Sequence, residues 1–206
     1  MNLKPYLLAL LPALVLLGSP AQAAKLKPQN LKQLISESES ILSGQVQSVT
    51  DGISDQGVPY TEVTIKVNNA AKGQHEKNST YTFRQFGLTK PQRNANGTKM
   101  LAVSPEGFPR WNTNETVIVF MHKAAKLTGL RTTAGMANGK FVVQGGKVSN
   151  EFNNFGVFND IEFAQGLLSE SENTMLKTTG AFSATDFMSL VGKAVSEQWI
   201  SNGKMK

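Results

Sequence analysis

The segment YTEVTIKVNNAAKG, residues 60–73, decides the fold that we expect for this chain. Apolar or small residues alternate with polar ones, and this period of two is typical of a strand with one face toward a core and the other toward water. The positions on the core face are Thr61, Val63, Ile65 and Val67. Gly73 permits the positive φ of a turn after the strand, and Lys72 beside it is expected to be solvated. We therefore expect this segment to be scaffold rather than part of a working site.

The segments on both sides also have β character. Residues 41–52, ILSGQVQSVTDG, end in Asp51-Gly52, which predicts a reverse turn. Gly44 inside this strand indicates a bulge or a tight bend, because glycine weakens the interior of a regular strand. Residues 79–87, STYTFRQFG, alternate as a third strand. The apolar run in residues 116–124, TVIVFMHKA, predicts a strand that is buried on both faces.

Shorter strands are expected further along the chain, separated by turns that contain glycine. They cover residues 126–135, 139–146 and 147–158. The dipeptide Asn138-Gly139 is a hairpin signal. The polar segment 167–180, LLSESENTMLKTTG, reads as a surface linker. The second half of the chain therefore continues the β pattern before it changes to helix.

A helix is expected at each end of the β region. Residues 31–40, LKQLISESES, place Leu31, Leu34 and Ile35 on one helical face, with Asn30 as the N-cap. In residues 183–200, Ser183 and Asp186 have the spacing of a capping box. The apolar stripe that follows consists of Phe187, Leu190, Val191 and Ala194. This stripe predicts an amphipathic C-terminal helix that packs against the sheet.

The first 23 residues have the organisation of a secretory signal peptide. One cation, Lys4, precedes an apolar run from Tyr6 to Leu17, and small residues stand at Ala21 and Ala23. The apolar run is shorter than the roughly 20 residues that a membrane-spanning helix needs. We expect cleavage after Ala23 and a periplasmic or secreted protein without a membrane span, with residues 24–206 as a single domain. The chain has no cysteine, which excludes disulfide bonds and thiolate chemistry.

The β pattern stops between Gly87 and Glu115, where prolines and glycines are frequent. Loops of this length inside a compact domain are usually either functional or disordered. Between Arg84 and Trp111 five cations face a single acid: Arg84, Lys90, Arg93, Lys99 and Arg110 against Glu106. Arginine forks beside aromatic rings suit carboxylate, phosphate or sugar partners. The predicted partner-binding residues are Arg84, Arg93, Phe108, Arg110 and Trp111; the plainer interpretation is a solvated loop whose aromatic residues attach it to the body.

Common catalytic signatures are absent from the sequence. There is no H-E-x-x-H, no G-x-S-x-G, no P-loop and no G-x-G-x-x-G after a strand. A zinc site could be built from the two histidines of the chain, His75 and His122, together with Glu76, but nothing in their spacing requires one. No catalytic residue, cofactor or metal site is therefore predicted. The carboxylates that an enzyme could use are Glu62, Glu106, Glu115, Asp160, Glu162 and Asp186.

Several strands, a glycine-kinked first strand and flanking helices favour a mainly β fold, which we expect to be a small OB-like barrel. The stretches ILSGQVQSV, TEVTIKV followed by Lys72-Gly73, and Arg110-Trp111 before ETVIVFM resemble a loose group of uncharacterised exported bacterial proteins. The resemblance covers residues 31–123. It implies a barrel shaped like netrin-type and metalloprotease-inhibitor modules. Those inhibitors reach their metal through an N-terminal cysteine, which this chain lacks.

Three functions are compatible with these observations. The first is a non-catalytic binding module of the bacterial envelope that holds a protein or an acidic glycan through the basic and aromatic loop. The second is an enzyme, a hydrolase, with an unrecognised site in the same region. The third is single-stranded nucleic-acid binding through rings such as Tyr81 and Phe83. Export disfavours the third, so no nucleic acid is expected as a partner.

Overall fold

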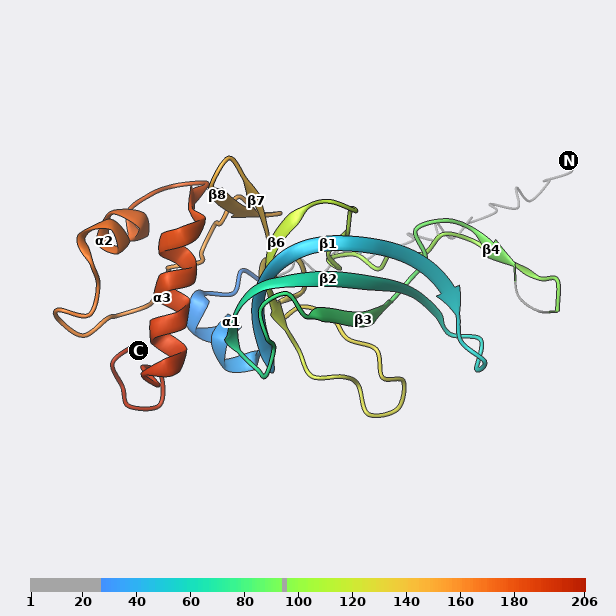
Figure 1. Ribbon diagram of the computed structural model, residues 1–206, viewed down its shortest axis with the longest axis horizontal. Helices are drawn as coiled ribbons and strands as arrows, with labels where there is room; N and C mark the ends of the chain where they lie inside the picture. The colour runs from blue at the N-terminus through green and yellow to red at the C-terminus, as the bar shows by residue number, and fades with distance from the viewer. Residues whose placement is uncertain (1–26, 94–95) are drawn as a thin grey trace, which may run out of the picture.

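The computed structural model describes residues 27–93 and 96–206 (Figure 1), and the predicted signal peptide, residues 1–23, lies outside this part of the chain. The elements are α1 (Leu31–Glu37), β1 (Ser40–Ile53), β2 (Pro59–Lys72), β3 (Thr80–Phe86), β4 (Gln92–Arg93), β5 (Lys99–Met100), β6 (Thr116–Met121), the 3-10 helix η1 (Met136–Gly139), β7 (Lys140–Gln144), β8 (Lys147–Asn150), α2 (Glu170–Leu176), β9 (Phe182–Ser183) and α3 (Ala184–Ser196).

The fold is mainly β, as the alternation predicts. Seven strands form one antiparallel sheet in the order β3-β2-β1-β6-β7-β8-β9, and β4 and β5 form a separate pair. The sheet is not closed into a barrel, so the expected OB-like closure is wrong: β3 and β9 remain its two edges. Among the described residues, one backbone hydrogen bond, from Arg131 N to Arg84 O (2.8 Å), joins the β3 edge to the segment after β6.

The sheet has a core on each face because β6 is apolar at every position after its first. Ile118 and Phe120 point to one side, where α1 and α3 cover the sheet. Val117 and Val119 point to the other side, where they meet the inward residues of β1, β2 and β3. The predicted burial of β6 on both faces is thereby confirmed. In Figure 1, β1 and β2 arch from the end covered by α1 and α3 toward the end that carries β4.

The central segment behaves as the alternation predicts. All four core-face positions of β2, Thr61 to Val67, are buried, while Lys66 and Asn68 are exposed. Gly44 lies at a register shift between β1 and β2, and a Cβ there would lie 2.3 Å from Lys66 O, so this position requires glycine. Lys72 is not a freely solvated residue, because its Nζ donates to Ile35 O at the end of α1 (2.8 Å).

The two predicted helices begin with the predicted caps. Asn30 caps α1 and Gln33 completes a capping box. Ser183 Oγ accepts from Asp186 N at the start of α3, and the four predicted stripe residues are its buried face. Within residues 27–93 and 96–206 no helix has the length and apolarity that crossing a membrane requires.

Two of the short strands expected after β6 are wrong or too long: residues 126–135 form turns with a single bridge at Thr133, and the strand expected over 147–158 ends at Asn150. Three predictions about short polar motifs are also wrong. β1 runs through Asp51-Gly52 to Ile53, and the chain turns after it. Asn138-Gly139 closes η1, whereas the hairpin between β7 and β8 turns at Gly145-Gly146. The predicted linker contains α2, which starts at a capping box made by Ser169 and Glu172. In each case the same short polar motif is compatible with more than one local structure, and contacts with the rest of the fold determine which one forms.

Candidate binding surface

The described residues between β3 and β6 form an isolated bridge and a strand pair that is separate from the main sheet. Leu88 and Val103 form an antiparallel bridge, and farther out β4 pairs with β5. We call residues 87–93 and 96–104 the arm, which projects from the end of the molecule opposite α3 (Figure 1). Gly87 begins it with φ +127°, and a Cβ there would lie 2.5 Å from Val103 O. The expected break in the β pattern is therefore a short hairpin with its own strand pair.

A carboxylate on β1 holds the base of the arm. Asp51 accepts hydrogen bonds from Thr89 N (2.9 Å), Thr89 Oγ1 (2.6 Å), Lys90 N (2.8 Å) and Thr61 Oγ1 (2.9 Å). Burial alone would raise the pKa of Asp51, but these hydrogen bonds outweigh it and lower the pKa below its ordinary value. The residue that we expected in a turn instead fixes where the arm leaves the sheet.

Trp111 anchors the chain after the arm. Its side chain is buried, it packs edge-on against Phe83 (5.1 Å between ring centroids), and its Nε1 donates to Gln85 Oε1 (3.2 Å). Gln85 Nε2 in turn donates to Pro109 O (3.0 Å). These contacts favour the plainer interpretation, in which Trp111 attaches the segment to the body, over a ring that is free to stack on a partner. The same holds for Phe83 and Tyr81 as base-stacking rings, because both are buried.

A buried ion pair fastens the same segment to β7. Lys140 Nζ lies 2.6 Å from Glu115 Oε1, with both side chains about nine-tenths buried. It also donates to Arg110 O and lies over the Trp111 ring, 4.9 Å from the centroid. Burial lowers the pKa of Lys140 below its ordinary value, although Glu115 opposes this. We call this arrangement the Lys140 clasp.

Two hollows lie on either side of the segment 109–112, and Arg110 lines both. The first, the Phe86 hollow, has a volume of about 440 Å³ and is lined mainly by β3, the base of the arm and this segment. The second, the Ser149 hollow, has about 370 Å³ and lies between this segment and β7 and β8. Their shared wall consists of Pro109, Arg110 and Asn112. Arg110 is exposed and forms no ion pair with any residue that the structure describes.

The other predicted residues do not converge on this wall. Arg84 is on the outward face of β3, where its Nε donates to Glu62 Oε2 (2.7 Å) and its guanidinium lies over Tyr60, 4.2 Å from the ring centroid. The hydrogen bond to Glu62 raises the pKa of Arg84 above its ordinary value. Arg93 is on β4 and lines a separate hollow against the turn between β1 and β2. Phe108 is half-buried.

Sequence reasoning found this segment but missed what holds it. In the sequence Gln85 is an ordinary polar residue of an alternating strand, and Lys140 is a cation between glycines. Glu115 was noted only as a carboxylate that an enzyme could use. The strand register does not mark the pair either: Lys140 stands opposite Val119, and its side chain meets Glu115, which lies just before β6.

The candidate zinc ligands do not come together. His75 Nε2 lies 3.0 Å from Ser40 Oγ, and the ring packs edge-on against Tyr81. His122 lies 3.6 Å from Glu37 Oε2. Among the described residues no three acidic or histidine side chains form a group that could hold a metal ion.

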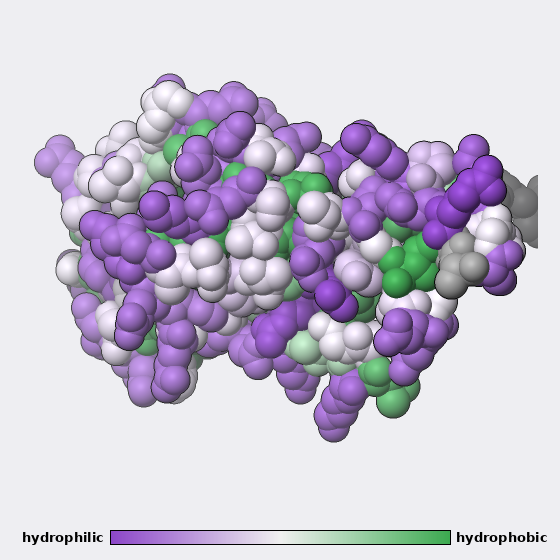
Figure 2. Space-filling model, turned by 45° about the vertical axis from the view of Figure 1, so that its right-hand side comes forward, coloured by the Kyte–Doolittle hydropathy of each residue, from purple (hydrophilic) through white to green (hydrophobic). Residues whose placement is uncertain are grey.

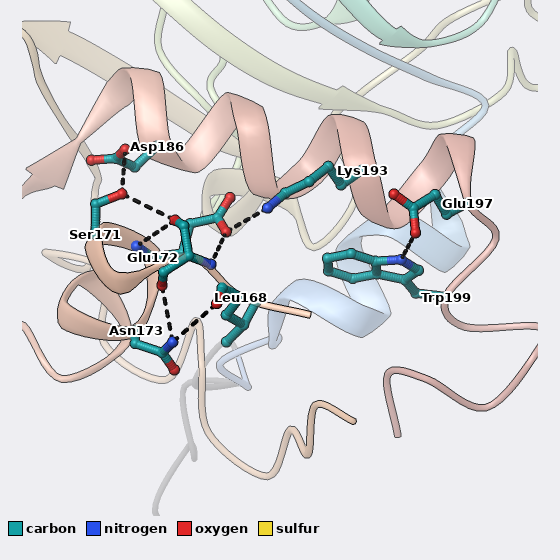
Figure 3. Close-up of polar contacts among 9 residues, drawn as sticks. Leu168, Ser171, Glu172, Asn173, Asp186, Lys193, Glu197 and Trp199 are labelled. Atoms are coloured by element: carbon teal, nitrogen blue, oxygen red, sulfur yellow. Dashed lines mark hydrogen bonds and ion pairs between the residues drawn. The ribbon is translucent and has the colours of Figure 1, made fainter. Parts of the chain in front are cut away.

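A second polar cluster joins α2 to α3 (Figure 3). Glu172 is buried, and its Oε2 accepts from Ser169 N (2.9 Å) and Lys193 Nζ (2.5 Å). Its Oε1 has no hydrogen-bond partner among the described residues. Glu172 lines none of the hollows described above, and both of its contacts fasten helices. We therefore assign this cluster a structural role.

Comparison of the chain with protein-family models, with curated proteins and with solved structures finds no match. The resemblance to exported bacterial proteins stays a prediction, and the function is argued from the geometry alone.

Proposed function

We propose that the protein is a non-catalytic binding module of the periplasm or the cell exterior, which holds an acidic protein or glycan across Arg110. The observation that carries this proposal is the position of Arg110, exposed and unpaired among the described residues, on the wall shared by two hollows. A guanidinium in this place can bind a carboxylate or phosphate with two hydrogen bonds. The hollows on either side give the rest of an extended partner room to lie.

Both hollows combine apolar and polar surface. The Phe86 hollow has Phe86 and Val103 beside Thr89. The Ser149 hollow has Val142 beside Ser149. An extended partner with an acidic group at its centre, and with both apolar and hydrogen-bonding groups on either side, matches this arrangement. The Lys140 clasp and the Gln85 contacts hold the wall rigidly, which reduces the conformational entropy lost on binding.

The alternative, a hydrolase with its site in the same region, depends on the Lys140 clasp, which lines the Ser149 hollow. A general base must reach the proton that it removes. Lys140 Nζ is instead engaged with Glu115 Oε1, Arg110 O and the Trp111 ring. These contacts favour a structural role for the pair. A captured glycan or peptide that is cleaved by the protein would contradict the non-catalytic proposal.

The experiment compares Arg110→Ala with the wild type in binding to poly-glutamate and to polygalacturonate, an acidic peptide and an acidic glycan. A hydrogen bond to a charged group contributes about 1.5–3 kcal/mol, so loss of the guanidinium should weaken binding by roughly 10-fold or more. Lys177→Ala removes the same charge from an exposed position just after α2, and it should bind as the wild type does. Equal affinity of Arg110→Ala and the wild type for both polymers would refute the proposal.

A further inference from the structure

Two hairpins expose a leucine beside lysines. Leu101 in the arm is 66% exposed, and Leu127 in the segment after β6 is 94% exposed. Lys99 stands two residues before Leu101, and Lys126 directly precedes Leu127. Isolated exposed leucines are ordinary. Two of them in the same chemical setting, on segments far apart in the sequence, call for a common explanation.

The arm concentrates positive charge. Arg93 and Lys99 stand directly opposite each other on β4 and β5. Like charges in such a cross-strand pair destabilise the hairpin. Lys90 adds a third cation, and the arm contains no carboxylate. Leu101 directly follows β5 and stands two positions after Lys99.

The second hairpin, residues 121–133, is ordered in the same way. It is closed by the bridge between Met121 and Thr133 and by a hydrogen bond from Ala125 N to Leu130 O (2.8 Å). Leu127 lies at its tip between these ends. Lys123 and Lys126 are both exposed. We call this segment the Leu127 hairpin.

Both hairpins protrude from the half of the molecule that lies away from α2 and α3 (Figure 1). At this end, Figure 2 shows apolar atoms exposed among strongly hydrophilic ones. Leu101 and Leu127 line none of the hollows described above. Their side chains therefore reach outward, and whatever contacts them must itself supply the apolar surroundings.

We infer that the arm and the Leu127 hairpin dock the protein onto an anionic lipid surface. Lysine and arginine meet acidic headgroups, while the neighbouring leucines enter the boundary between headgroups and acyl chains. A lipid surface accepts apolar side chains at any position, so it needs no preformed pocket. An acidic protein would need a pocket for each leucine at a matching spacing. This surface is distinct from the Arg110 wall and goes beyond the proposed binding function.

The test is flotation of the chain after the expected signal cleavage, residues 24–206, with vesicles of phosphatidylcholine, with and without about one third phosphatidylglycerol. The wild type should float with the anionic vesicles and stay behind with the neutral ones. The double variant Leu101→Ser, Leu127→Ser keeps every charge and should lose roughly nine-tenths of the floated protein. Lys99→Gln, Lys126→Gln keeps both leucines and should lose a comparable share.

The matched control is Phe155→Ser, which removes the third highly exposed apolar side chain, 68% exposed, from a segment flanked by acids. It should float as the wild type does, and all variants should unfold at the same temperature because the changed side chains are exposed. The inference is overturned if the wild type ignores anionic vesicles, if the leucine variant floats fully, or if Phe155→Ser loses as much. Capture by poly-glutamate instead of vesicles, dependent on Lys99 and Lys126, would overturn it in favour of an acidic protein. Binding of acidic polymers at Arg110 is a separate measurement, and its outcome does not depend on the outcome of the flotation test.

Discussion

Single side chains decide where the arm and the segment 109–112 lie. Asp51 orders the first residues of the arm, and Gln85 spans the gap between Trp111 and Pro109. Neither residue differs in the sequence from an ordinary polar residue of a strand. Their roles could not be predicted because their partners in the arm and in the segment 109–112 are at least two dozen residues away along the chain.

Replacing Asp51 by Asn should destabilise the protein by about 1–3 kcal/mol, because several donors of the arm base lose a charged acceptor. The lowered pKa also determines how the free energy of unfolding changes with pH. Stability from Asp51 is fully present above the ordinary carboxyl pKa and is lost as the pH falls through the lower folded-state pKa. Urea unfolding at pH 7 and at pH 3 should show a smaller acid loss for Asp51→Asn. A variant with wild-type stability and wild-type acid loss would contradict this role.

His75 gives the opposite case. Burial lowers its pKa below the ordinary value, the Arg131 guanidinium adds to this, and Glu39 opposes it. Tyr81 packs against its ring. The unfolded chain therefore binds the proton first, and stability should fall as the pH drops from about 6.5 toward the folded-state pKa. Thermal unfolding between pH 7.5 and 5 should show a shallower slope for His75→Gln, and equal slopes would exclude His75 as the source.

At the scale of elements, sequence patterns predict the features that depend on contacts between residues close together in the chain. The alternation of β2, the caps of α1 and α3 and the stripe of α3 depend on residues within a few positions of one another, and all are present. α2 was missed because its buried face consists only of Glu172 and Met175. A helix that buries a carboxylate shows no apolar periodicity in its sequence. The burial of Glu172 is explained only by its ion pair with Lys193 on α3, and that contact is not visible in the sequence of α2.

The Lys140 clasp is the element-scale contact with the clearest consequence. Lys140→Met should destabilise the protein by about 3–5 kcal/mol, because it leaves Glu115 buried without its partner. Trp111 fluorescence should shift toward that of an exposed indole as the segment loosens. The double variant Lys140→Met, Glu115→Leu should recover most of the stability, since an apolar pair can replace a buried ion pair. A double variant as unstable as the single one would show that the pair has another role.

At the scale of the whole molecule, the sequence predicts the fold class but not the closure. A barrel and an open sheet share the same alternation, strand lengths and glycine bulge, because these features describe neighbouring strands only. Closure depends on whether the first and last strands meet, and here β3 and β9 do not. The sequence likewise predicts the segment of the candidate site but not its arrangement. Arg84, Arg93 and Arg110 lie apart, because Arg93 is on the arm and Arg84 is on the outward face of β3.

The central claim is that an acidic partner lies across Arg110, between the Phe86 and Ser149 hollows. The most direct measurement is a titration of ¹⁵N-labelled protein with poly-glutamate and with polygalacturonate, followed through the amide resonances. The account predicts that one of these polymers shifts the amides of Ser104, Asn112 and Gln144, and that Arg110→Ala abolishes the shifts. Shifts that centre on α2 and α3, or that persist in Arg110→Ala, would contradict it.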